Sequence, residues 1–239
     1  LALLATTAMI LRLELVCLAV PAYLWTWWHH QRRFVYVFMT GAVTCAGSIA
    51  LSVLVDSYFW RKRFLWPEGH AVIFNVIEGR SAEWGVSPPW TYVVRDLPRI
   101  LFAAFPLALL GCTRRSSFRL PLVLLICTHV GLMSFLAHKE WRFLVYIVPL
   151  CNMLAAQGAS MLIRTYLGRW LMLGLVGTSA ALWILGTHVS IYNYPGGEAL
   201  RILHTQMQEA QVVHIDTLAA MTGVSLFQSI HLARPAHSL

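Results

Sequence analysis

Four ionisable side chains lie within five residues of one another in the segment HKEWRF, residues 138–143, where one apolar stretch ends and the next begins. Ionisable groups at a membrane edge are costly unless they are solvated or used. If the segment is helical, His138 and Arg142 are four residues apart and face the same way. Arg142 can hold phosphate oxygens through two N–H groups, His138 can donate to another oxygen, and Glu140 can orient either cation. The cluster therefore predicts a phosphate clamp; the alternative is interfacial anchoring, with Lys139 and Arg142 reaching toward headgroups.

The segment from Asp56 to Trp90 is the second concentration of polar and aromatic side chains. Beside Asp56 it contains four tryptophans, a run of three cations and three further carboxylates, among other polar groups: Trp60, Trp66, Trp84, Trp90, Arg61, Lys62, Arg63, Glu68, Glu78 and Glu83. Indole faces stack on sugar C–H surfaces, carboxylates accept hydrogen bonds from sugar hydroxyls, and cations attract lipid phosphate. We therefore interpret the segment as a binding loop. An interfacial re-entrant loop with its tryptophans at headgroup level is an equally weighted alternative.

Other polar groups lie inside apolar stretches. Arg12 and Glu14 are two residues apart, so on a continuous helix they point apart and do not neutralise each other. A mid-membrane ion pair with other helices and simple structural burial are equally favoured for them. His129 and His188 are predicted to be hydrogen-bonded core or pore residues.

The composition places these residues in a membrane. The chain has 239 residues, of which 58% are hydrophobic and only 12% charged. Soluble domains carry about 25% charged residues. This scarcity argues against a cytosolic globular enzyme, a disordered chain and a nucleic-acid-binding domain, and it indicates an integral membrane protein.

The elements that must position the polar groups are six apolar stretches, which predict an all-α polytopic bundle. They are Leu1–Trp28, Phe34–Val55, Leu97–Gly111, Leu120–Ala137, Phe143–Ile163 and Trp170–Ile191. The third stretch has only 15 residues, about 22 Å of helix, so we expect its helix to begin earlier, near Trp90.

The distribution of charge predicts the orientation of this bundle. The connections 29–33, 112–119 and 164–169 hold seven arginines and no acid, whereas eight of the ten acids lie in or next to the connections on the other side. The positive-inside rule makes the arginine-rich side cytosolic. The loop 56–89, the HKEWRF cluster and the tail 192–239 then face the other way.

The tail predicts a small α/β unit beyond a bundle that ends at residue 191. Leu200, Leu203 and Met207 line one face of a possible helix, and Val212–Asp216 has the pattern of a short strand. The chain has no D-x-D, Walker, H-E-x-x-H or G-x-S-x-G motif and no C-x-x-C spacing, so we expect no metal site and no cofactor.

The segments HKEWRF, DSYFW, WPEG, EWGVSP, DLPR and RLE together resemble the dolichyl-phosphate-mannose-dependent mannosyltransferases of glycosyltransferase family 22, multispanning enzymes of the endoplasmic reticulum. The likeness runs from about Arg12 to the end of the chain. Within the family, WPEG, WGVSP and the tail motifs NYPGGEAL and HIDTLAAMTGVSLF are most similar to the branch that makes an α-1,6 linkage on the lipid-linked N-glycan precursor.

The resemblance implies a helical bundle of the GT-C type in the endoplasmic reticulum membrane, with its active side luminal. It implies an inverting mannosyl transfer from dolichyl phosphate mannose to a dolichol-linked oligosaccharide. Donor phosphate binding falls to His138, Lys139 and Arg142. Substrate binding falls to Asp56, Trp60, Glu68, Trp84 and Arg99. Arg12, Glu14 and Glu140 are assigned structural or polar intramembrane roles.

The family's catalytic base is expected in a first luminal loop, upstream of Leu1, so we expect residues 1–239 to be inactive alone. The alternatives are an α-1,2-mannosyltransferase of the same family that acts on N-glycan or GPI precursors, a secondary transporter that uses the intramembrane polar residues, and a non-catalytic membrane subunit.

Overall fold

The computed structural model describes residues 1–29, 33–206 and 213–224, and these residues are helical with irregular connections. They divide into two compact units, Leu1–Val176 and Gly177–Leu239. Among the described residues, three segments are long and apolar enough to cross a membrane: Phe34–Trp60, Trp141–Leu162 and Tyr166–Ile191. Two shorter apolar helices, Ala104–Thr113 and Arg119–Ser134, accompany them. The chain therefore has the character of a helical membrane protein.

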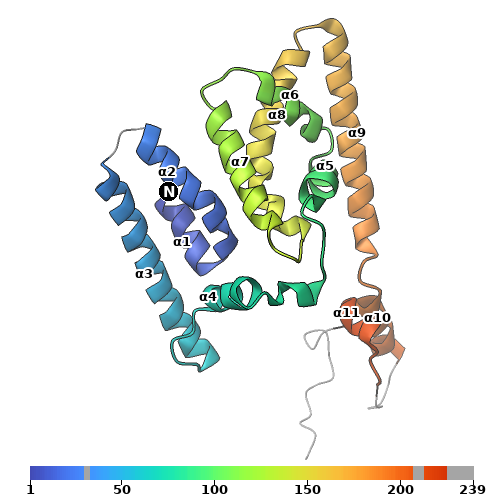
Figure 1. Cartoon of the computed structure of the whole chain (residues 1–239). Helices are drawn as coiled ribbons and strands as arrows, with labels where there is room; N and C mark the ends of the chain where they lie inside the picture. Colours follow the sequence, from blue (N-terminus) through green and yellow to red (C-terminus); the bar gives the residue numbers. More distant parts are fainter. Residues whose placement is uncertain (30–32, 207–212, 225–239) are drawn as a thin grey trace, which may run out of the picture. The chain divides into compact units, whose positions relative to one another are not determined.

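The first apolar stretch is not one helix, contrary to the expectation for Leu1–Trp28. Helix α1 (Ala2–Ile10) is followed by Arg12 in an extended conformation, by a 3₁₀ turn η1 (Leu13–Leu15) and by α2 (Val16–His29). Figure 1 shows α1 and α2 as separate helices next to α3 (Phe34–Trp60).

The break between α1 and α2 is stabilised by the segment that follows α3. The amide N–H of Leu13 donates to Glu68 Oε2 over 2.8 Å, and Trp66 Nε1 donates to the carbonyl of Met9 over 2.9 Å. Backbone groups in an apolar environment must find protein partners. The break is tolerated because α4 (Pro67–Val72) and the residue before it supply these partners.

The segment between α3 and α6 is built from short turns. A π-turn η2 (Ile73–Ile77) and a 3₁₀ turn η3 (Arg80–Trp84) follow α4. The next helical stretch begins with the π-turn η4 (Tyr92–Asp96), which continues into α5 (Leu97–Leu101), so the expected start near Trp90 is confirmed. Phe102, with φ 47°, interrupts the expected Leu97–Gly111 helix before α6 (Ala104–Thr113).

The remaining helices of the first unit support the HKEWRF cluster. Helix α7 (Arg119–Ser134) ends before it, and the 3₁₀ segment η5 (Trp141–Ile147) leads from it into α8 (Val148–Leu162). Helices α6 and α8 pack closely, because a Cβ on Gly111 would lie 1.9 Å from the carbonyl oxygen of Leu154. Small residues permit such an approach between helices in membranes.

Helix α9 (Tyr166–Ile191) spans the division between the two units. The second unit continues with α10 (Pro195–Gln206) and α11 (Thr217–Met221), which Asp216 caps by accepting from Ala219 N over 2.6 Å. The helix expected around Leu200 and Leu203 is confirmed, while Met207 lies outside the described residues. Val212 also lies outside them, and residues 213–216 form no strand, so no strand of the expected α/β tail is seen in the described part.

Candidate functional site

A polar cavity of about 710 Å³ lies where the α1–α2 break, the turns after α4 and the HKEWRF cluster meet. We call it the polar cavity. The lining comprises Arg12, Leu13, Glu14, Val16, Cys17, Glu68, Ala71, Val72, Asn75, Val76, Ser81, Trp84, Met133, Leu136, His138, Glu140, Arg142 and Phe143. Residues from three distant parts of the chain thus converge on one space, although each part was predicted from the sequence as a separate polar site.

One wall of the polar cavity carries the Arg142 guanidinium beside the His138 ring, and Glu140 holds both; we call it the cationic wall. His138 Nε2 lies 2.9 Å from Glu140 Oε1, and Arg142 donates to the same oxygen over 2.7 Å and also pairs through Nε with Oε2. The helical spacing assumed from the sequence is wrong, because residues 138–140 form no helix and η5 begins at Trp141. The shared carboxylate, rather than a common helix face, brings His138 and Arg142 together.

Lys139, between His138 and Glu140 in the sequence, is not among the residues that line the polar cavity. Its side chain is buried, and Nζ donates to the carbonyls of Leu136 over 2.6 Å and Ser87 over 3.1 Å. Burial lowers the pKa of Lys139. Ser87 N also donates to the carbonyl of Ala137 over 3.0 Å. Both backbone groups of Ser87 therefore tie the WGVSP segment, residues 84–88, to the HKEWRF cluster and the residue before it.

The conformation of Gly85 places the WGVSP segment close to the cationic wall. Gly85 has φ 111°, a value that L side chains rarely adopt, and a Cβ there would lie 3.8 Å from His138 Nδ1. The preceding Trp84 lines the polar cavity and is nevertheless 66% exposed, so its indole face is available to a ligand.

Two further carboxylates, of Glu14 and Glu68, also line the polar cavity, and we call this part of the lining the carboxylate wall. Glu68 Oε2 accepts from Leu13 N, and Glu14 Oε1 accepts from Tyr146 OH over 3.1 Å. Burial raises the pKa of Glu68; the hydrogen bond from Leu13 opposes that rise, and the charge of Glu14 adds to it. Because the helix breaks at Arg12, its guanidinium lies 3.8 Å from Glu14, so the expectation that these two residues point apart is wrong.

Three predicted substrate residues lie outside the polar cavity. Asp56, near the end of α3, accepts from Ser52 Oγ over 2.6 Å. Trp60 is 65% exposed at the end of the same helix, and Arg99 is exposed on α5. Four of the predicted phosphate-binding and substrate-binding residues line the polar cavity: Glu68, Trp84, His138 and Arg142. Three residues with predicted structural or polar roles line it as well: Arg12, Glu14 and Glu140. Asp56, Trp60 and Arg99 do not.

Sequence reasoning missed Tyr146 and the Leu13 amide. Tyr146 lies in an apolar run that also holds a Phe and several aliphatic residues, so its hydroxyl carries no distinguishing pattern. The two charges in an apolar run, Arg12 and Glu14, are the sequence signal that could have indicated the helix break. The usual signal is absent, because no Gly or Pro lies next to them. His129 is confirmed as a hydrogen-bonded core residue, with Nε2 2.7 Å from the carbonyl oxygen of Phe143, whereas His188 is exposed on α9.

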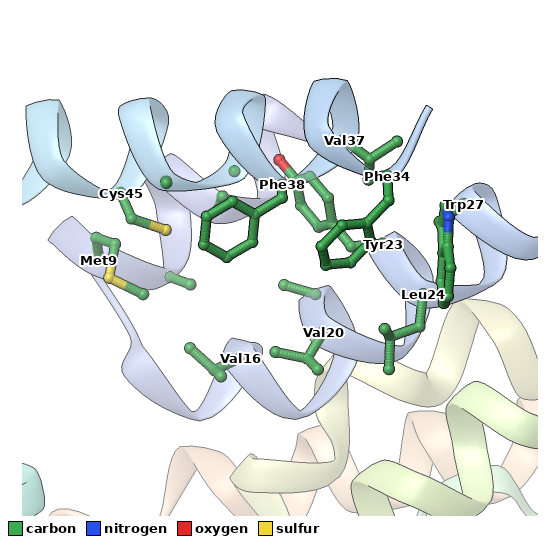
Figure 2. Close-up of a pocket in the computed structure, with 15 residues that line it drawn as sticks. Met9, Val16, Val20, Tyr23, Leu24, Trp27, Phe34, Val37, Phe38 and Cys45 are labelled. Atoms are coloured by element: carbon green, nitrogen blue, oxygen red, sulfur yellow. The ribbon is translucent and has the colours of Figure 1, made fainter. Parts of the chain in front are cut away.

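A second cavity, of about 270 Å³, lies between α1, α2 and α3 (Figure 2). We call it the apolar cavity. Its lining is hydrocarbon and aromatic, with Met9, Val16, Val20, Leu24, Trp27, Phe34, Val37, Phe38 and Cys45 among the residues that Figure 2 labels. The buried hydroxyl of Tyr23 finds no hydrogen-bond partner in the described structure. Nothing in this lining can hold a phosphate.

The polar cavity combines groups whose chemistry suits different parts of a glycosyl phosphate. The cationic wall can stabilise negative charge that develops on a departing phosphate. The carboxylates can accept hydrogen bonds from hydroxyls. Among the described residues, no group of three or more His, Cys, Asp or Glu side chains is placed to hold a metal ion.

Comparison with known proteins finds similarity to mannosyltransferases, both in a family model and in individual relatives. Residues 1–231 match the sequence model of the Alg9-like mannosyltransferase family. A Schizosaccharomyces pombe protein named as a probable Dol-P-Man:Man(7)GlcNAc(2)-PP-Dol alpha-1,6-mannosyltransferase is 34% identical over 91% of this chain and 41% of its own length. The Arabidopsis thaliana and Drosophila melanogaster proteins of that name are 39% and 40% identical, each over 77% of this chain and over 39% and 28% of their own lengths.

GPI mannosyltransferases that are also similar match a smaller part of the chain. A Danio rerio GPI alpha-1,2-mannosyltransferase 3 is 31% identical over 44% of the chain, so the α-1,2 alternative is not favoured. The chain spans between 28% and 41% of the length of the three α-1,6 relatives described above. No solved structure matches it significantly.

Proposed function

The chain belongs to the Alg9-like mannosyltransferase family, and from this premise we propose that the whole protein transfers mannose from dolichyl phosphate mannose to the dolichol-linked oligosaccharide Man7GlcNAc2, forming an α-1,6 linkage. The names of its relatives supply the donor, the acceptor and the linkage. The observation that carries the proposal for this chain is the polar cavity, where the cationic wall and the carboxylate wall face one space.

We assign the donor phosphate to the cationic wall. Arg142 is paired with Glu140 through part of its guanidinium, and its side chain is 59% exposed, so further N–H groups can reach a ligand. His138 can donate to another phosphate oxygen. Lys139 already donates to two carbonyls, so we propose that it supports the wall by fixing the WGVSP segment, and that its charge adds to the local field.

We assign the acceptor oligosaccharide to the carboxylate wall and to the surface around it. Glu68 accepts from a sugar hydroxyl, and the exposed indole of Trp84 stacks on a sugar face. Asp56, Trp60 and Arg99 lie outside the polar cavity, which suits contacts with sugars farther from the new linkage.

The reaction that follows is one in-line displacement. An acceptor hydroxyl attacks the anomeric carbon and gives its proton to a general base of the whole protein. Dolichyl phosphate leaves with the bonding electrons, and the configuration inverts. Preorganised donors are most effective where charge develops in the transition state. The cationic wall supplies such donors at the departing phosphate, and no metal or cofactor beyond the lipid donor enters this scheme.

The same proposal places the protein in the endoplasmic reticulum membrane as a multi-pass bundle of the GT-C type over residues 1–191, with residues 192–239 as a luminal tail. Six apolar stretches and three arginine-rich connections on one side support this topology. The polar cavity then faces the lumen.

The experiment is an assay of the full-length protein in membranes from cells that lack the endogenous enzyme. Labelled mannose supplied as dolichyl phosphate mannose should enter the lipid-linked acceptor in a bond that an α-1,6-specific mannosidase cleaves. Transfer into an α-1,2 bond would contradict the linkage, and no transfer from this donor would contradict the reaction.

A further inference from the structure

Glu14 is held against the polar cavity by one of its two carboxylate oxygens. Oε1 accepts from Tyr146 OH over 3.1 Å and lies 3.8 Å from an Arg12 nitrogen, and the Glu14 side chain is 16% exposed. Within the described part of the chain, neither contact uses Oε2. An ionised carboxylate offers about four acceptor positions, so half of this group remains able to accept from a ligand.

Tyr146 is fixed by the core behind it. Its ring packs edge-on against His129, with 6.1 Å between ring centroids, and His129 is fully buried with Nε2 2.7 Å from the carbonyl oxygen of Phe143. A carbonyl only accepts, so Nε2 carries the hydrogen. The packing of its ring therefore holds the hydroxyl of Tyr146 in place to donate to Glu14, which lies 132 residues earlier in the sequence.

The chemistry of this wall selects a neutral polyhydroxy ligand. Glu68 has one oxygen on Leu13 N, as Glu14 has one on Tyr146, and both carboxylates face the same cavity. The guanidinium of Arg12 offsets only one of the two carboxylates, so this part of the lining repels a phosphate, which the cationic wall attracts. The hydroxyls of the sugar bonded to that phosphate, or of the sugar that attacks it, suit the carboxylates instead.

We propose that Glu14 is a substrate-binding residue that accepts a hydrogen bond from a hydroxyl of a mannosyl unit, and that Tyr146 is the residue that positions it. This inference rests on the proposed function. The same chemistry is presented by the mannose of the donor and by the mannose of the acceptor that receives the new bond.

The test measures hydroxyl discrimination by the full-length protein in membranes. The substrates are dolichyl phosphate mannose, its 2-, 3-, 4- and 6-deoxy analogues, and acceptors that lack one hydroxyl on the receiving mannose. The measured quantity is kcat/KM for the parent substrate divided by kcat/KM for each deoxy analogue. Glu14→Gln should lower one of these ratios about tenfold and leave the others unchanged. A change in the donor series assigns Glu14 to the donor sugar, and a change in the acceptor series assigns it to the acceptor.

Tyr146→Phe keeps the ring and removes only the hydroxyl, so it should lower the same ratio by about threefold. Tyr23→Phe is the matched control, because it removes a buried hydroxyl that has no hydrogen-bond partner in the described structure and lies in the apolar cavity. It should change no ratio.

A structural role would give a different result. If Glu14→Gln and Tyr146→Phe lower transfer from every substrate by one common factor, the inference is wrong while the proposed function stands. If Glu14→Gln does not accumulate, the Tyr146→Phe ratios decide the question alone. If the wild-type protein transfers no mannose from any donor, the proposed function itself fails.

Discussion

The polar cavity and the apolar cavity share the α1–α2 segment and have opposite chemistry. The polar cavity lies at the break, where Arg12 leaves the helix and Leu13 turns its amide toward Glu68. The apolar cavity lies beside the helical turns of α1, α2 and α3, and its lining is hydrocarbon and aromatic (Figure 2). The difference teaches that polar chemistry in this membrane protein is concentrated where a helix stops, because there the backbone itself needs polar partners.

If the cationic wall binds the departing phosphate, Arg142→Ala should have the largest effect on transfer. We expect turnover per folded enzyme to fall by about 100-fold to 1,000-fold, as for the loss of one transition-state donor. Labelled-mannose transfer in membranes, normalised to protein amount, measures it. Arg115→Ala is the control, since Arg115 is an exposed arginine on the predicted cytosolic side. If Arg142→Ala turned over as fast as Arg115→Ala, the cationic wall would not bind the departing phosphate, and the polar cavity would be no more important for transfer than the apolar cavity.

Removal of Glu140 should have the next largest effect, because this carboxylate holds His138 and Arg142 in one place. We expect Glu140→Ala to lower kcat about 10-fold to 100-fold, while Glu140→Gln, which keeps one acceptor oxygen, loses less. Steady-state kinetics on both variants measure it. An Ala variant no worse than the Gln variant would mean that the positions of His138 and Arg142 do not depend on Glu140.

The carboxylate wall should give a smaller effect that depends on pH. The raised pKa of Glu68 means that this carboxyl takes up its proton at a higher pH than an ordinary Glu, so hydroxyl binding by the ionised form is lost earlier as the pH falls. We expect Glu68→Gln to lower kcat/KM for the acceptor about tenfold at neutral pH and to remove this acid limb. A pH profile of kcat/KM tests both, and an unchanged limb in the variant would assign it to another group.

A substitution in the apolar cavity should have the smallest effect on transfer. Met9 is buried in this lining, and truncation of a buried Met typically lowers stability by about 2–5 kcal/mol. We expect Met9→Ala to lower the melting temperature while turnover per folded enzyme stays within about twofold. Thermal unfolding in detergent and the transfer assay measure the two quantities. A loss of turnover without a loss of stability would show that the apolar cavity takes part in the reaction.

Much of the fold followed from the sequence because long apolar runs leave few alternatives in a membrane. The run Phe34–Val55 became α3, and the run Phe143–Ile163 became the spanning segment Trp141–Leu162. The interruptions were not predictable in the same way. Arg12 and Phe102 both leave helical geometry. No Gly or Pro lies beside Arg12, and the neighbours of Phe102 are aliphatic or aromatic, so neither sequence marks a break. Their conformations depend on partners from elsewhere in the chain.

The candidate site followed from the sequence only in part. Residue types identified the HKEWRF cluster and Glu68 because charge is rare in this chain. The spacing rule failed at His138 and Arg142, since a bridging carboxylate replaced the helix face. Tyr146 was missed because the value of its hydroxyl depends on Glu14, 132 residues earlier, and no local pattern records that contact.

The central claim is that the donor phosphate binds at the cationic wall of the polar cavity. Its most direct test is a cryo-electron microscopy map of the full-length protein with dolichyl phosphate mannose bound. We predict phosphate density within hydrogen-bond distance of the Arg142 guanidinium and the His138 ring, with the mannose toward Glu14 and Glu68. Phosphate density bound away from the polar cavity, for example at Arg99, would contradict the account.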